Sequence, residues 1–74
     1  MKIQTNKSFN VPAEGFAVSA PSAPYTLQYS ADGVTFSDYE ETIPANEVLF
    51  VSGLPKNAIY KLKSNTTEDL YIQY

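Results

Sequence analysis

The chain has 74 residues and contains neither cysteine nor histidine, which excludes disulfides and the thiolate and imidazole ligands of a structural zinc site. Eight acidic residues outnumber five basic ones, all of them lysine, for a net charge of -3. Without arginine, a nucleic-acid partner is not expected.

A domain of this length buries only about 60% of the surface that its unfolded chain exposes. We therefore expect a marginal core that gains stability from a partner subunit or a docking surface. No segment approaches the roughly 18 consecutive apolar residues of a membrane-spanning helix. Residues 1–6 also lack the apolar core of a signal peptide, so we expect synthesis in the cytoplasm and no membrane partner.

Apolar residues recur with a period of two and are rich in Tyr, Phe, Val and Ile, which is typical of half-buried strands. Five prolines interrupt every window that could hold an amphipathic helix. In chain order, the first strands are expected over residues 2–5, 8–11 and 16–20. The apolar side chains of the third strand share one face: Phe16, Val18 and Ala20.

The strongest local signal is that of a β-hairpin. Residues 25–30 are expected to form its first strand and residues 34–36 its second. Asp32 and Gly33 supply the positive backbone angles of a tight turn. The apolar side chains of the first strand again share one face: Tyr25, Leu27 and Tyr29.

A polar stretch, residues 37–41, is expected to connect the hairpin to the next strand. That strand covers residues 47–51, which are continuously apolar after Glu47 and therefore indicate burial on both faces. In so small a domain, we expect a neighbouring molecule to cover one of those faces.

Two further strands are expected over residues 58–63 and 70–74. In the first, alternation directs Tyr60 and Leu62 inward and the two lysines outward. In the second, Tyr71 is expected to point outward. Three side chains of that strand are expected to point inward: Leu70, Ile72 and Tyr74.

Six or seven short strands at these spacings predict an all-β fold, a small antiparallel Ig-like β-sandwich. A single domain is expected to span residues 1–74, with residues 1–12 as a candidate for an extended docking arm.

Without His or Cys, the chain lacks the common general base near neutral pH and the most nucleophilic side chain. Acidic residues gather near the hairpin, where they could form the carboxylate pair of a glycosidase or supply oxygen ligands to calcium. They are Asp32, Asp38, Glu40 and Glu41. So short a domain has little room for a deep cleft, and a solvated acidic loop is the favoured interpretation. We therefore expect no enzyme, no catalytic residue, no cofactor and no bound metal.

Six tyrosines are numerous for this length. Exposed tyrosines supply rigid, amphipathic contact area in protein interfaces and can also stack on sugar rings. Aromatic packing across neighbouring strands is the competing interpretation. The tyrosines outside the hairpin core and the apolar run give the predicted interface: Val48, Phe50, Tyr71, Tyr74 and Tyr39.

Three segments carry a resemblance to a known group: Tyr-Ser-Ala-Asp-Gly-Val-Thr-Phe at 29–36, Glu-Thr-Ile-Pro-Ala at 41–45 and Val-Ser-Gly-Leu-Pro at 51–55. With them, residues 25–74 resemble small virion proteins of tailed phages, especially auxiliary or head-decoration proteins of the crAss-like group infecting gut Bacteroidales. The first segment also resembles hairpins of discoidin-like and fibronectin-like sandwiches, including carbohydrate-binding ones.

The phage resemblance implies a β-sandwich that docks on an icosahedral capsid shell. Its partner would be the major capsid protein or another virion protein, and a homo-oligomer is a further option. The protein would be made in the host cytoplasm and would reside on the capsid surface. The alternative function is a glycan-binding or adhesin module.

Overall fold

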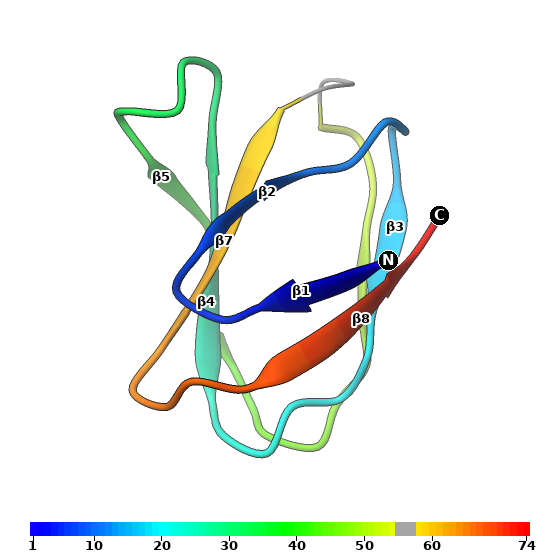
Figure 1. Cartoon of the computed structure of the whole chain (residues 1–74), viewed down its shortest axis with the longest axis vertical. Helices are drawn as coiled ribbons and strands as arrows, with labels where there is room; N and C mark the ends of the chain where they lie inside the picture. Colours follow the sequence, from blue (N-terminus) through cyan, green and yellow to red (C-terminus); the bar gives the residue numbers. More distant parts are fainter. Residues whose placement is uncertain (55–57) are drawn as a thin grey trace.

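The computed structural model describes residues 1–54 and 58–74, without the side chains of residues 40–42. This described chain has no helix, and its eight strands form two four-stranded antiparallel sheets (Figure 1). The strands are β1 (Lys2–Gln4), β2 (Ser8–Asn10), β3 (Phe16–Val18), β4 (Tyr25–Ser30), β5 (Ser37–Ile43), β6 (Leu49–Val51), β7 (Ile59–Ser64) and β8 (Asp69–Gln73). The all-β prediction is confirmed, whereas the predicted count of six or seven strands is too low. No helix that could cross a membrane is present among the described residues.

Strand pairing follows the pattern of one long hairpin that has been rolled up. From tip to ends, β4 pairs with β5, β3 with β6, β2 with β7 and β1 with β8. The ends of the hairpin are held together because the amino group of Met1 donates to the Ile72 carbonyl at 2.8 Å and the Ile72 N–H donates to the Met1 carbonyl at 2.7 Å. Rolling adds two more pairings, of β3 with β8 and of β4 with β7.

The result is a first sheet with the order β1-β8-β3-β6 and a second sheet with the order β2-β7-β4-β5. This is the strand order of a jelly roll, a double sheet built from two Greek keys. An Ig-like sandwich places its first two strands side by side in one sheet, whereas β1 and β2 lie in different sheets here. The Ig-like part of the prediction is therefore not confirmed.

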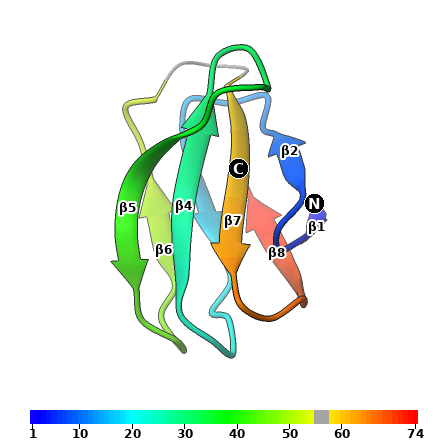
Figure 2. The same ribbon diagram turned by 90° about the vertical axis from the view of Figure 1, so that its left-hand side faces the viewer.

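Figure 2 shows the second sheet face on, with the first sheet behind it. The edge strands β5 and β6 lie on one side of the sandwich, and β1 and β2 lie on the other. Ile3 and Val11 both belong to the core. In this structure, residues 1–12 are thus built into the two sheets and do not extend from them as an arm.

The core between the sheets centres on Tyr60, whose side chain is fully buried. Its ring stacks on Phe9 at a centroid distance of 5.7 Å and meets Phe16 edge-on at 4.9 Å. Leu27 and Leu62 of the second sheet are fully buried around it. The inward positions predicted for Tyr60 and Leu62 are confirmed.

Three local predictions are wrong. The second hairpin strand was expected at residues 34–36, but β5 begins only at Ser37 and contains the whole of the expected polar connection, residues 37–41. A strand at the edge of a sheet needs no apolar outer face, which is why its polar sequence concealed it. Ala20 and Tyr74 are exposed because β3 ends at Val18 and β8 ends at Gln73.

Candidate docking surface

The candidate surface is the outer face of the first sheet, named here the β8–β6 face after the two strands that carry its large side chains. All five predicted interface residues are exposed, with side chains accessible to 78% (Phe50), 62% (Tyr71), 60% (Tyr74), 53% (Val48) and 37% (Tyr39). Two other large apolar side chains, Met1 and Val34, are also exposed, and the prediction did not include them. Burial of residues 47–51 on both faces is wrong for the chain by itself, because alternation turns Val51 inward and Phe50 outward.

Strand register brings these side chains onto one surface. Phe50 on β6 lies opposite Ala17 on β3, and Ala17 in turn lies opposite Gln73 on β8. One step along, Ser19 is joined to Tyr71 by two hydrogen bonds of 2.9 Å, from the Ser19 N–H to the Tyr71 carbonyl and from the Tyr71 N–H to Ser19 Oγ. β3, which lies between β6 and β8, thus presents small side chains between the large apolar ones of its two neighbours.

Charge is nearly absent from this face. Among the described strand residues that point outward from the first sheet, only Lys2 and Asp69 are charged, and they form an ion pair of 3.4 Å. Lys2 lies directly opposite Tyr71 in the register of β1 and β8. The β8–β6 face therefore combines exposed apolar area with a charge pair that neutralises itself.

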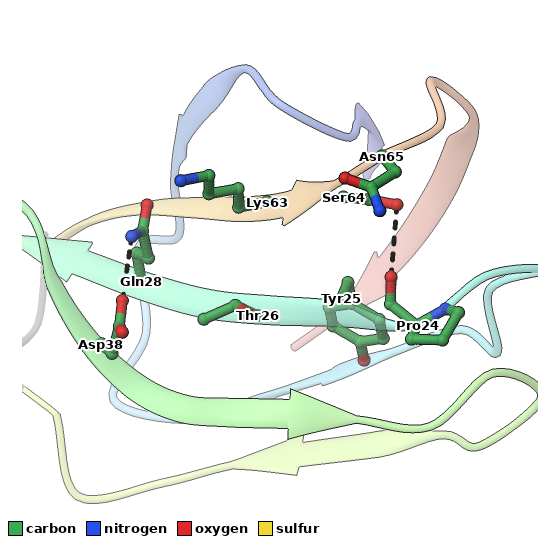
Figure 3. A pocket seen from close by; sticks show the side chains of 8 residues that line it. All are labelled: Pro24, Tyr25, Thr26, Gln28, Asp38, Lys63, Ser64 and Asn65. Atoms are coloured by element: carbon green, nitrogen blue, oxygen red, sulfur yellow. Dashed lines mark hydrogen bonds between the residues drawn. The ribbon is translucent and has the colours of Figure 1, made fainter.

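The outer face of the second sheet has the opposite character. There Gln28 donates to Asp38 at 2.9 Å, and the Lys61 ammonium lies 4.4 Å from the centre of the Phe36 ring. A shallow hollow of about 280 Å³ opens on this face (Figure 3). Its lining residues are Pro24, Tyr25, Thr26, Gln28, Asp38, Lys63, Ser64 and Asn65. The hollow lacks an aromatic platform, since the Tyr25 ring is buried in the core.

The two remaining predicted interface residues lie away from the centre of the β8–β6 face. Tyr39 belongs to β5 of the second sheet, and its hydroxyl reaches across the side of the sandwich toward the Ser52 carbonyl at 3.4 Å. Tyr74 follows the end of β8. The structure thus gathers Val48, Phe50 and Tyr71 on one face and places Tyr39 beside it.

Of the acidic residues considered for catalysis or calcium binding, the structure describes the side chains of Asp32 and Asp38. Asp32 caps the loop of residues 31–36, where its Oδ1 accepts the N–H groups of Val34 at 2.8 Å and Thr35 at 3.0 Å and the hydroxyl of Ser30 at 2.9 Å. These bonds stabilise the carboxylate and lower the pKa of Asp32 to about 2. Asp38 is held by Gln28.

The side chains of Glu40 and Glu41 lie outside the described residues. Within the described part, no group of three or more acidic side chains is placed to hold a metal ion. The arrangement that the structure shows for Asp32 is that of a turn cap.

Two tyrosine hydroxyls are buried in the core and have no hydrogen-bond partner among the described residues, those of Tyr25 and Tyr60. Burial, together with the charge of Glu47, raises the pKa of Tyr25 to about 12. Burial also raises the pKa of Tyr60, with a smaller effect from Tyr39. Both hydroxyls face the interior between the sheets, so neither takes part in the surface.

Sequence reasoning did not identify Ala17 and Ser19 as part of the candidate surface. Ala17 and Ser19 alternate with Phe16 and Val18, and this pattern is equally typical of an ordinary solvent-exposed strand face.

Comparison with protein-family models, with curated proteins and with solved structures finds no match for this chain.

Proposed function

We propose that this chain is a virion structural protein of a tailed phage, an auxiliary or decoration protein that docks on the capsid shell. The observation that carries the proposal is the β8–β6 face, where Phe50, Tyr71 and Val48 are exposed around small residues. The two charged side chains among the described outward-pointing strand residues of this sheet form an ion pair. Exposed apolar patches with few charges mark protein–protein contact sites.

Two further considerations support this function. Residues 25–74 resemble small virion proteins of tailed phages, and the jelly-roll strand order recurs in viral capsid proteins as well as in lectins. The second consideration is an analogy of fold, which by itself does not determine function. The placement of the apolar face is independent of the resemblance, although it depends on the strand order.

Docking would act by burying area at the seams between capsomers. A specific interface buries roughly 1,200–2,000 Å² in total, about half of it on each partner. The chain exposes 4395 Å², so one such contact would cover roughly a fifth of its surface. Repetition over the shell adds avidity to each contact. The partner would be the major capsid protein or another virion protein. The role requires no catalytic group, cofactor or metal.

Particles with and without the protein test the cementing role. Particles that lack it should lose their contents at lower temperature or lower ionic strength, and added purified protein should restore the original stability. Equal stability of the two kinds of particle would contradict the cementing role.

A glycan-binding module is the second candidate, and the surroundings of Tyr71 favour it. Asp69 and Gln73 flank this tyrosine on the same face of β8, and Lys2 lies opposite. A sugar ring stacked on Tyr71 would find carboxylate, amide and ammonium groups nearby for its hydroxyls. A glycan array separates the two functions. Binding that Tyr71→Ala or Tyr39→Ala abolishes would favour this candidate, and a blank array would count against it.

A further inference from the structure

The four edge strands of the sandwich differ in how well they are protected against pairing with another chain. Sheet edges are usually guarded by charges, by proline or by bulges. β5 contains three acidic residues and has irregular register with β4. β1 carries Lys2, and Lys7 directly precedes β2. In β6 and the residue before it, residues 48–51 are Val-Leu-Phe-Val, with no charge, proline or glycine, and the nearest charged residue in sequence is Glu47.

We propose that β6 pairs antiparallel with β6 of a second copy of this chain. The two first sheets would then join, across a two-fold axis, into one continuous sheet of both copies. A second copy fits because β6 is hydrogen-bonded to β3 on one side only, and its other side has no strand partner among the described residues.

The register of this pairing follows from the direction of the side chains. Residues directly opposite each other in an antiparallel pair point to the same face, so Phe50 must oppose another outward-facing residue. With Phe50 opposite Phe50 of the second copy, Leu49 lies opposite Val51, so the pairs formed by residues 49–51 are all apolar, and Val48 lies opposite Ser52. Placing Leu49 on the axis instead would set the charged Glu47 opposite Val51, whose side chain is buried.

The length of the exposed edge also matches a second copy. Asn46 and Gly53 adopt positive φ angles of 65° and 80°, which turn the chain away from the extended conformation at both ends of the segment. A longer strand from another protein would extend past these turns, whereas residues 47–52 of a second copy span the same length. Residues 48–51 are uncharged, and the charge nearest to them in sequence is that of Glu47 at the end of the segment.

This dimer is a property of the chain alone and does not require the capsid function. It would place Val48, Phe50 and Tyr71 of both copies on one side of the joined sheet. The dimer would therefore present twice the docking area of a single copy.

Single-cysteine variants test the pairing and its register, because the natural sequence has no cysteine. Directly opposite residues have Cα atoms about 4.5–5.5 Å apart, within the roughly 4.4–6.8 Å that a disulfide spans. Under mild oxidation, Phe50→Cys should cross-link between copies at least about tenfold faster than Tyr71→Cys, since pairing raises its effective concentration toward millimolar. Tyr71→Cys is the matched control, an exposed aromatic on the same face but two strands from the edge.

Light scattering provides the second measurement and needs no cross-link. The wild type and Tyr71→Lys should show a mass that rises from monomer to dimer with concentration, and Phe50→Lys should remain monomeric. Equal cross-linking rates for the two cysteine variants, or a wild type that stays monomeric at every concentration, would overturn the proposal. Since no shell is present in either assay, that outcome would leave the docking function as it stands.

Discussion

Tyr60 is the largest fully buried side chain, and its hydroxyl has no hydrogen-bond partner among the described residues. Tyr60→Phe removes only that hydroxyl, so the free energy of unfolding should stay unchanged or rise by up to about 1 kcal/mol. Tyr60→Ala also removes the ring between Phe9 and Phe16 and should lower the free energy of unfolding by about 3–5 kcal/mol. Urea unfolding of the three proteins measures both values. A loss above about 1 kcal/mol in Tyr60→Phe would mean that the hydroxyl is hydrogen-bonded after all.

The contribution of Asp32 to the stability of the fold depends on pH, and the lowered pKa of its carboxyl group determines the sign. Its carboxylate is favoured in the folded chain, where the pKa is about 2 against an ordinary value of 3.8. Its contribution to stability is therefore complete above the ordinary pKa and is lost as the pH falls through the folded value. We expect Asp32→Asn to be less stable than the wild type near neutral pH and the difference to vanish toward pH 2. Thermal unfolding across this range checks the prediction, and a difference that does not change with pH would contradict it.

At the scale of the element, the turns depend on two glycines with left-handed backbones. Gly33 and Gly53 have φ angles of 81° and 80°, but a Cβ on Gly33 would lie 3.1 Å from Cδ1 of Ile59, whereas a Cβ on Gly53 meets nothing within 4 Å. Each alanine variant should lose about 1–2 kcal/mol for the backbone conformation, and Gly33→Ala should lose more because of the contact. Chemical unfolding of both variants measures the difference. Equal losses would show that the loop of residues 31–36 moves away from Ile59 without penalty.

The strands show which parts of the fold can be predicted from sequence. Alternation predicts the inward faces of β4, β7 and β8 correctly, because each strand has one face in the core and the period of two is a direct consequence. β5 was not predicted as a strand, because it lies at the edge of the second sheet and its side chains are mostly polar. The hairpin turn is longer than Asp-Gly suggested because Ser30 and Asp32 cap a wide loop whose Phe36 packs against Lys61.

At the scale of the whole molecule, the order of strands in the sheets could not be predicted. The pairing of β1 with β8 joins residues about as far apart in sequence as the chain permits, and such pairings leave no local pattern. The candidate surface depends on this order, because Val48, Phe50 and Tyr71 share a face only once β3 lies between β6 and β8. Sequence could identify the exposed residues but not their assembly into one surface.

The two outer faces of the sandwich give the molecule a polarity. The second sheet presents lysines, an aspartate and amides. The first sheet presents Phe50 and Tyr71 around small residues, together with Gln73 and the ion pair of Lys2 and Asp69. Docking through the first sheet would leave the polar face toward solvent, as expected for a protein that decorates a larger assembly. The proposed function therefore requires that the first sheet, and not the second, binds the shell.

Co-sedimentation with purified capsid shells, using one variant for each face, tests that claim most directly. Tyr71→Ser changes the β8–β6 face and lies away from β6, and Lys63→Ser changes the outer face of the second sheet. If the β8–β6 face docks on the shell, the wild type and Lys63→Ser should pellet with shells at a stoichiometric ratio and with equal affinity. Tyr71→Ser should bind at least about tenfold more weakly, as for an aromatic at the centre of an interface. Wild-type affinity in Tyr71→Ser together with weakened binding in Lys63→Ser would contradict docking through the β8–β6 face.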